Sequence, residues 1–579
     1  MKKAIIITLI SISAQTSLAD YHYASHEGSN TYPYTSWATA AHLIQDAVDA
    51  ADRRDTIFVG TGDYYQRVFL HTDSLSLVGM GMDSTRIWYD IPLYIIVRID
   101  SSAYIANIEF EHTDNYLIIS PSIFVRQFEV NNCRFLGGGI SAEGRALIRN
   151  SYFNGEHSYV ISGIGDDYLH IENCYFCGAD FSPIYSYSDT NIILNNIITT
   201  EWGSGIILAT GDYVANNLVV VRMAPQCIYM WPRNDGVCLV NNTLDTTSTD
   251  FQVLGRGIRI IGENRSITMS NNDIVSGEDM AVWFGGYNST LYASYNNIWR
   301  APVDFVVDSP SSQVDTSFGL LHEYPMYMGG DDYHLQAFSP LIDAGDPAIL
   351  DVDGSRSDIG CYGGPGGCSY TYLDMAPLIP DSISAFVDSG AIILSWRYNY
   401  EADFNRYQVY RDTIPGFQPS IFDIIAEPDT SYYEDTDILP GTPYYYRLTS
   451  VDNQGNISDF SEEIAVIPTS AWDIIEANLP YEPRITSAYP NPFNSNVVIV
   501  YSASNLGPQP PQVTLKVYDI QGRVVKTLVD DRIPQGTYRA IWDGTNDSGE
   551  PVASGTYIAR VSQWDCPGGD FPVKITLIK

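Results

Sequence analysis

The chain has 579 residues, of which 69 are acidic and 31 basic, so its formal net charge is −38. A surface with this balance repels the phosphates of nucleic acids and anionic lipid head groups, which excludes DNA and RNA as expected partners. Hydrophobic residues make up 45% of the chain, and its 42 Tyr, 45 Gly and 31 Pro favour β structure with many turns.

The first 19 residues have the three parts of a secretory signal peptide. Lys2 and Lys3 form a basic start, residues 4–12 form a short apolar run, and residues 17–19 (SLA) offer small side chains for cleavage after Ala19. The apolar run is too short to cross a bilayer, and no later stretch reaches about 18 apolar residues. The sequence therefore predicts a secreted protein, in the extracellular space or on the outer cell surface, with no membrane span.

Residues 37–51 (WATAAHLIQDAVDAA) place several alanines, Ile44 and Val48 on one face of a helix. A stack of repeats leaves an open hydrophobic end that needs a cap. We expect this helix to cover the N-terminal end of the repeats that follow.

From residue 105 onward a short pattern recurs nine times: apolar, any, Asn, any, any, apolar. The mean spacing of about 24 residues is too short for two-helix repeats of about 33 residues, and the leucine-rich frame is absent. The pattern predicts a solenoid whose successive turns pair in parallel, with Asn in left-handed turns and its amides bonded along the axis. The predicted structural ladder consists of Asn107, Asn132, Asn150, Asn173, Asn195, Asn216, Asn241, Asn271 and Asn296.

Both ends of the repeat region carry further motifs. Residues 34–87 contain SWATAAHLIQDAVDAADRRDTIFVGTGDY and LSLVGMGMDSTRI, and residues 339–364 read SPLIDAGDPAILDVDGSRSDIGCYGG. These segments resemble the start and the end of secreted right-handed parallel β-helix proteins of the pectate-lyase-like superfamily. The resemblance covers about residues 30–365 and implies such a helix for residues 20–365. It does not imply one activity, because the superfamily includes lyases, hydrolases, epimerases and non-catalytic surface proteins.

Residues 376–468 contain short alternating strands, among them AIILSWRY and PYYYRLTSVD. Trp396 is well placed as a core residue of an early strand. The segment LPGTPY, which ends at Tyr444, resembles the tyrosine corner of fibronectin type III domains. We expect a β-sandwich that acts as a spacer or a weak binder.

Residues 485–579 contain YPNPFNSNVVIVYS and GTYRAIWDGTNDSGEPVASGTYIARV, in which NDSG and ASG mark turns between strands. The segment resembles the C-terminal sorting domain of the Bacteroidetes-type secretion system, and equally the Ig-like domain of flagellar hook-capping proteins. We favour sorting because the segment ends an exported chain, which implies export machinery as a partner. The predicted fold class is thus all-β: a parallel β-helix followed by two Ig-like β-sandwich domains.

One group of side chains in the repeats suits a binding site. Asp167 and Asp189 each lie six residues before a ladder Asn, which would place them on adjacent turns about 5 Å apart. Carboxylates at this separation can hold Ca²⁺ or divide acid and base roles, although both also lie in ordinary turn sequences. Tyr185, Tyr187 and Trp202 lie nearby in the sequence and can stack on sugar rings.

Two function classes remain open. HExxH, GxSxG and nucleotide-binding motifs are absent from the sequence, and its nine His lack metal-ligand spacing. We therefore expect no metal or other cofactor, with Ca²⁺ as an alternative at the acidic pair. The favoured function is a surface-attached or released monomer that binds extracellular polysaccharide or cell-surface glycans, or acts in adhesion, without catalysis. The alternative is a polysaccharide lyase or glycoside hydrolase, whose catalytic residues the sequence does not identify.

Overall fold

The computed structural model describes residues 19–578 apart from 92–94, 113–116, 122–126, 143, 156–159, 164–167, 180–181, 210, 224–225, 234, 247–255, 277–279, 389, 469–482, 504–509, 535 and 564–571. The predicted signal peptide therefore lies outside the described residues except for Ala19. The chain divides into two compact units, residues 1–374 and 375–579. No helix among the described residues is long and apolar enough to span a membrane.

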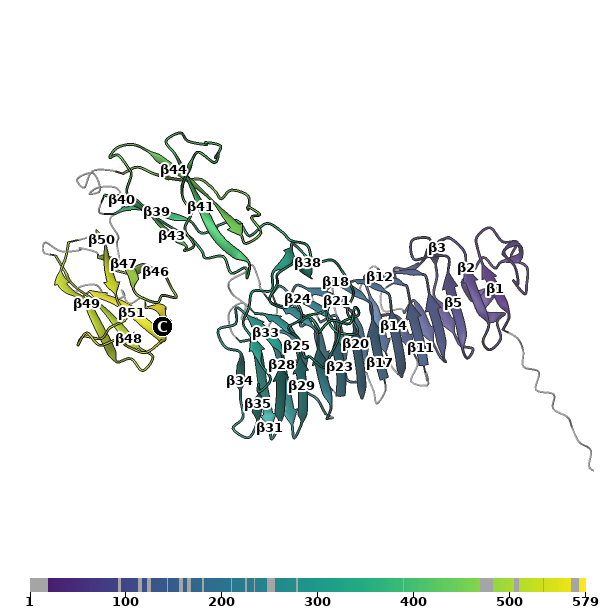
Figure 1. The fold of residues 1–579 in the computed structure, drawn as a ribbon. Helices are drawn as coiled ribbons and strands as arrows, with labels where there is room; N and C mark the ends of the chain where they lie inside the picture. The colour runs from purple at the N-terminus through teal and green to yellow at the C-terminus, as the bar shows by residue number, and fades with distance from the viewer. Residues whose placement is uncertain are drawn as a thin grey trace, which may run out of the picture. The chain divides into compact units, whose positions relative to one another are not determined.

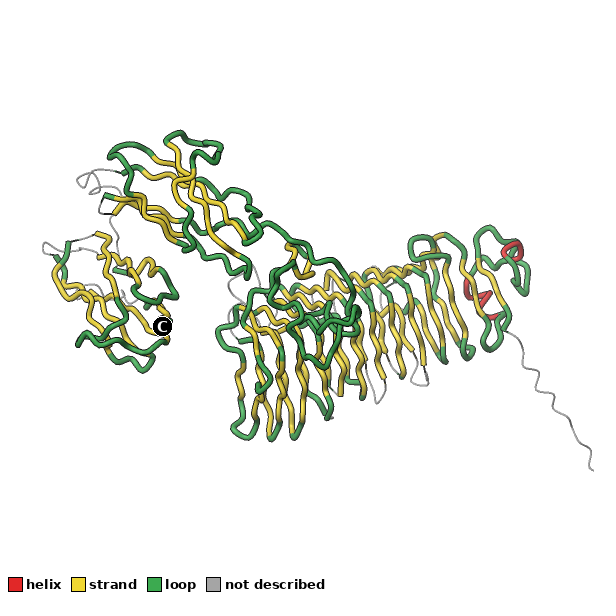
Figure 2. The backbone as a smooth tube through the Cα atoms, in the orientation of Figure 1, coloured by secondary structure: helices red, strands yellow, loops and turns green. Residues whose placement is uncertain are grey.

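The first unit is a parallel β-helix, as predicted (Figures 1 and 2). Each circuit of the chain adds one strand to each of three sheets, which have 13, 12 and 11 strands among the described residues. Sheet A consists of β1 (Tyr21–Ala24), β2 (Thr56–Val59), β5 (Leu75–Gly79), β8 (Ala103–Ala106), β11 (Gln127–Asn131), β14 (Arg145–Arg149), β17 (Tyr168–Glu172), β20 (Thr190–Leu194), β23 (Gly211–Ala215), β26 (Val237–Val240), β29 (Ser266–Ser270), β32 (Thr290–Ser294) and β35 (Gln313–Asp315).

Sheets B and C complete each circuit. Sheet B consists of β3 (Gly62–Tyr65), β6 (Thr85–Tyr89), β9 (Glu109–His112), β12 (Arg134–Leu136), β15 (Tyr152–Asn154), β18 (Tyr175–Ala179), β21 (Ile197–Thr200), β24 (Leu218–Val221), β27 (Thr243–Asp245), β30 (Asp273–Val275), β33 (Asn296–Trp299) and β36 (Leu320–Leu321). Sheet C consists of β4 (Val68–Leu70), β7 (Val97–Ile99), β10 (Leu117–Pro121), β13 (Gly139–Ala142), β16 (Ile161–Gly163), β19 (Ile184–Ser186), β22 (Ile206–Leu208), β25 (Gln226–Met230), β28 (Arg256–Glu263), β31 (Val282–Tyr287) and β34 (Phe305–Val307). A short hairpin, β37 (Tyr327–Gly329) and β38 (Asp332–Leu335), follows.

Inward side chains stack in rows along the helix axis, because strands of successive circuits pair in register. In sheet B the rings of Phe110, Phe135, Phe153 and Phe176 are fully buried. Their centroids are 5.3, 4.7 and 4.8 Å apart from one ring to the next. Each buried ring contributes about 2 kcal/mol, so this row is a substantial part of the core.

The N-terminal cap differs from the predicted single helix over residues 37–51. The segment forms a 3-10 turn, η1 (Trp37–Thr39), and a short helix, α1 (Ile44–Asp49). Between them Ala41 is extended, because its backbone N–H donates to the carbonyl of Tyr23 and its carbonyl accepts from Ser25 N–H. α1 packs against β1, β2 and β4 and so covers the first circuit.

An outer row of Asn lies at the corner between sheets A and B. Eight of the nine predicted ladder residues have left-handed backbones, with φ between 50° and 59°. We call them the outer ladder: Asn107, Asn132, Asn150, Asn173, Asn195, Asn216, Asn241 and Asn271. Asn296 is the exception and corrects the prediction, because Tyr295 (φ 53°) takes the left-handed position and shifts Asn296 by one residue.

Asn296 instead ends an inner ladder that the sequence analysis did not separate from the outer one. Its members, 0–1% exposed, are Asn196, Asn217, Asn242, Asn272 and Asn296. Each Nδ2 donates to the Oδ1 of the next Asn at 2.9–3.0 Å. Each of these Oδ1 atoms also accepts the backbone N–H of the preceding Asn at 3.0–3.1 Å. The buried amides thereby satisfy one another, which their burial requires.

A C-terminal segment, residues 345–367, runs back along the outer ladder, and we call it the strap. Asn216 Nδ2 donates to the carbonyl of Cys361 at 3.0 Å, and Asn241 Nδ2 donates to that of Asp358 at 2.9 Å. Asn271 Oδ1 accepts the backbone N–H of Asp346 at 2.7 Å. The strap therefore covers the last three members of the outer ladder.

Beside the strap, Asp273 of β30 is completely buried. Its carboxylate accepts hydrogen bonds from Tyr327 OH at 2.5 Å and from Asn297 Nδ2 at 2.9 Å, and Asp245 lies on the preceding strand of the sheet. Burial, with a smaller contribution from the charge of Asp245, raises the pKa of Asp273 to about 7 against these two hydrogen bonds.

The second unit holds two antiparallel domains, each with two sheets over a shared core. The first has fibronectin type III-like features: Trp396 and Tyr407 pack edge to face in the core, and Tyr444 OH accepts the N–H of Leu439 at 2.9 Å, as a tyrosine corner requires. Its strands are β39 (Ser384–Asp388), β40 (Ala391–Ser395), β41 (Phe404–Asp412), β42 (Ile424–Ala426), β43 (Tyr432–Asp435), β44 (Tyr444–Asp452) and β45 (Ile464–Val466). The second, Ig-like domain has β46 (Ile485–Tyr489), β47 (Val497–Ala503), β48 (Gln512–Asp519), β49 (Val524–Arg532), β50 (Gly536–Trp542), β51 (Gly555–Gln563) and β52 (Val573–Leu577).

Replacing Asn217 by Leu should lower the free energy of unfolding of the β-helix by about 3 kcal/mol or more. The change leaves the buried amide of Asn196 and the carbonyl of Ile193 without their partners. Asn195→Gly should cost less than about 1 kcal/mol, since glycine tolerates the left-handed turn. Urea unfolding of both variants checks the difference, and equal losses would contradict separate roles for the two ladders.

The pH dependence of stability should carry the signature of Asp273. The folded state keeps this carboxyl protonated up to a pKa of about 7, whereas the unfolded chain releases the proton near 3.8. The folded state therefore binds more protons between these values, and stability falls as pH rises through that window, by at most about 1.4 kcal/mol per pH unit. Asp273→Asn should flatten the dependence, whereas Asp331→Asn, at a fully exposed side chain, should not. An unchanged slope in Asp273→Asn would refute the assignment.

Candidate functional site

The outward face of sheet C carries aromatic and cationic side chains in its second half. Tyr185 on β19, Tyr229 on β25, Arg259 on β28 and Trp283 on β31 fall in one register row, with Ile207 of β22 between the first two. Figure 1 shows β25, β28 and β31 as neighbours in this sheet. Side chains alternate along a strand, so these residues point outward.

Two more aromatic residues follow the ends of their strands. Tyr187 lies directly after β19 and Trp231 directly after β25. Their ring centroids are 5.6 Å apart, and Ala209 at the equivalent place after β22 leaves room between them. Tyr185 contacts Tyr187 edge to face at 5.0 Å, and Tyr229 contacts Trp231 at 4.9 Å. The aromatic row therefore comprises Tyr185, Tyr187, Tyr229, Trp231, Arg259 and Trp283, all partly exposed.

The guanidinium of Arg259 lies between two rings of the row. Its Cζ is 5.0 Å from the ring centroid of Tyr229 and 4.8 Å from that of Trp283. Among the described residues, its Nε has no hydrogen-bond acceptor and no carboxylate pairs with it. Arg259 is thus a positive charge held by ring faces on a chain of net charge −38.

Gly285 determines how Trp283 lies. A Cβ at Gly285 would come within 2.4 Å of the Trp283 ring, so the indole occupies the space that a side chain at position 285 would take. Both residues belong to β31 and share one face of the strand. Glycine at this position therefore lets the indole lie along the sheet.

The row can bind but shows no arrangement for chemistry. Aromatic faces cover the C–H surfaces of sugars, and guanidinium N–H groups donate to hydroxyl or acidic oxygens. Within the described part of the β-helix, no three His, Cys, Asp or Glu side chains come close enough to share a metal ion.

The structure treats the predicted site residues differently. It brings Tyr185 and Tyr187 together, with their hydroxyls hydrogen-bonded to each other. Trp202 is 58% exposed on the turn between β21 and β22 and has no ring contact with a described aromatic residue. Asp189 is exposed between β19 and β20, and Asp167 lies outside the described residues, so the acidic pair stays a prediction.

Four members of the row were not predicted from the sequence. Tyr185, Tyr229, Arg259 and Trp283 lie 12, 13, 18 and 12 residues after the outer-ladder Asn of their circuits. The longer segment before Arg259 hides the alignment. Strand patterns counted backward from the next ladder Asn offer a signal that the forward count loses.

Comparisons with known proteins match parts of the chain. A family model described as FlgD Ig-like domain matches residues 503–565, which include most of the antiparallel strands of the last domain. Two proteins named amylopullulanase are similar over 94 residues, one from Thermoanaerobacterium saccharolyticum at 31% identity and one from Thermoanaerobacter thermohydrosulfuricus at 34%. Each match covers 16% of this chain and 7% or 6% of the relative, so the chain spans less than a tenth of the length of either.

Solved structures also resemble parts of the chain. An Fn3-like protein from Clostridium thermocellum is 31% identical, over 17% of this chain and 98% of that one, with a TM-score of 0.15. The A-module of a mannuronan C-5 epimerase from Azotobacter vinelandii is 14% identical, over 49% of this chain and 94% of that one, with a TM-score of 0.34.

Proposed function

We propose that the chain is an extracellular protein that binds a linear glycan along the aromatic row of sheet C, in adhesion or surface attachment, without catalysis. The observation that carries the proposal is the continuity of the row, from Tyr185 on β19 to Trp283 on β31 across five neighbouring strands. Rows of equivalent residues on a solenoid make extended binding surfaces, which suit a long chain better than a small molecule.

The chemistry of the row supports a sugar ligand. Flat rings provide apolar contact without needing a deep pocket, and Arg259 offers donors that no described acceptor occupies. An interface built only from apolar groups would discriminate poorly between ligands, whereas one fixed cation among rings favours ligands with oxygen atoms at a defined position.

The enzyme alternative, a polysaccharide lyase or glycoside hydrolase acting on extracellular polysaccharide, makes a different prediction. A panel of polysaccharides incubated with the chain should show binding without new reducing ends and without unsaturated products. Cleavage of any member would replace the binding proposal by the enzymatic one.

We further propose that the last domain directs export, with the secretion machinery as its partner. Its position after the β-helix and its similarity to an Ig-like family support a module that acts on delivery rather than on glycans. The predicted signal peptide supplies the first export step under this proposal.

Trp283→Ala and Tyr229→Ala should each weaken glycan binding about tenfold, because each removes a ring contact of about 1.4 kcal/mol. Tyr292→Ala is the matched control, since Tyr292 is 45% exposed on sheet A, outside the row. Affinity electrophoresis in gels that contain the polysaccharide measures the change. Equal retardation of all three variants would contradict the assignment of the row.

Deletion of residues 485–579 should trap the chain in the periplasm of a host with the matching secretion system. Deletion of residues 376–468 removes a domain of similar size and should leave delivery intact. Cell fractionation and surface labelling measure the outcome. Normal surface delivery without residues 485–579 would refute the export role and leave glycan binding untouched.

A further inference from the structure

The strap covers only part of the outer ladder. Asn216, Asn241 and Asn271 are 9%, 1% and 0% exposed beneath it. The ladder continues beyond the strap through Asn195 and Asn173 toward Asn107, and these side chains are partly or fully exposed. The same row of amides is therefore half covered and half open.

The covered half shows what the amides bind. Asn216 and Asn241 donate to backbone carbonyls of the strap, at Cys361 and Asp358. Asn271 accepts a backbone N–H from it. The ladder thus binds an extended polypeptide through its main chain, at intervals set by the spacing of the turns.

Glycine in the strap makes this close approach feasible. A Cβ at Gly345 would lie 2.9 Å from the Asn271 amide, and one at Gly363 would lie 2.9 Å from that of Asn241. At Gly366 a Cβ would lie 2.6 Å from Asn216 Oδ1. Positions that contact the ladder therefore select glycine.

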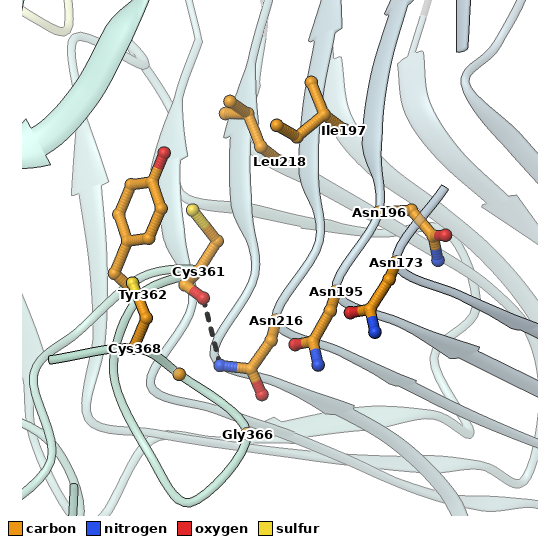
Figure 3. A pocket seen from close by; sticks show the side chains of 11 residues that line it. Asn173, Asn195, Asn196, Ile197, Asn216, Leu218, Cys361, Tyr362, Gly366 and Cys368 are labelled. Carbon is orange, nitrogen blue, oxygen red and sulfur yellow. Dashed lines mark hydrogen bonds between the residues drawn. The ribbon is translucent and has the colours of Figure 1, made fainter. Parts of the chain in front are cut away.

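A pocket of ≈ 260 Å³ lies where the strap ends, at the junction of the covered and open halves. Figure 3 shows the amides of Asn173, Asn195 and Asn216 in a row along one side, with Tyr362 and Cys368 of the strap region opposite. Ile197, 38% exposed, and Leu218 supply an apolar wall. The pocket joins main-chain donors and acceptors to a place for one apolar side chain.

The open amides retain hydrogen-bonding capacity. The side chain of Asn195 makes no hydrogen bond with any described residue. Asn173 Nδ2 makes one long bond of 3.4 Å to Asn150 Oδ1, which uses one of its two hydrogens. Both amides can therefore bond to a ligand without breaking a ladder contact.

We propose that the open half of the outer ladder, from the pocket toward Asn107, binds an extended glycine-rich segment of a partner polypeptide in the way that the covered half binds the strap. The ladder lies at the corner between sheets A and B, whereas the aromatic row lies on sheet C. The proposal is therefore independent of glycan binding by the row.

The probe is a fluorescent synthetic peptide with the sequence of residues 357–367 (SDIGCYGGPGG) carrying Cys361→Ser, titrated with the full chain and followed by anisotropy. We expect saturable binding. The variant with Asn173→Gly and Asn195→Gly should bind at least about tenfold more weakly, because two or more amide-to-carbonyl bonds are lost while glycine keeps the left-handed turns.

The matched control carries Asn264→Gly and Asn288→Gly, a second pair of left-handed, amide-bonded Asn on another turn of the helix. This control should bind the peptide as the unmodified chain does. A peptide with Gly363→Ala and Gly366→Ala should lose affinity for every chain, which tests the glycine requirement without altering the protein.

Three results would overturn the proposal. The first is no saturable binding at millimolar peptide, and the second is equal binding by both double variants. The third is competition by a linear oligosaccharide whose own affinity falls with Asn173→Gly and Asn195→Gly, which would assign the ladder to glycans. Retained binding of polysaccharide by the aromatic row in the ladder variants distinguishes failure here from failure of the glycan-binding proposal.

Discussion

The buried amides at the corner of sheets A and B constrain the whole β-helix. An Asn side chain inside the core must find partners for two donors and an acceptor, and the next turn supplies them only if the turns stack in register. The bond from Asn196 to Asn217, repeated through Asn242 and Asn272, meets this condition at 2.9–3.0 Å. A slip of one residue would break every such bond at once, so the inner ladder fixes the register of the second half of the helix.

Fixed register turns single residues into rows. Tyr229, Arg259 and Trp283 come from circuits of unequal length, yet the ladder aligns them on one face of sheet C. The same alignment keeps the outer-ladder amides in a line that the strap follows. Two surfaces of different chemistry, one of rings and one of amides, thus arise from one packing rule on separate faces of the solenoid.

The sequence carried enough information to predict the architecture and little of the site. Asn at left-handed turns is visible in the sequence because few other residues tolerate that geometry, and it predicted eight outer-ladder positions. Asn296 misled the alignment because Tyr295 occupies the left-handed turn in its place. The cap at residues 37–51 was predicted as one helix, whereas backbone pairing of Ala41 with β1 interrupts it. The partners of Tyr185 could not be predicted because insertions between strands, as before Arg259, change the spacing along the chain while leaving the spatial row intact.

Hydroxyl-radical footprinting of the full chain, with and without a polysaccharide that it binds, tests most directly whether the aligned row of sheet C is the glycan-binding surface. Protection should appear at Tyr229, Trp231 and Trp283. The exposed Tyr213 and Tyr292 of sheet A should oxidise at unchanged rates and provide an internal reference. Protection of the sheet A tyrosines, with the row as reactive as in the free protein, would contradict the account.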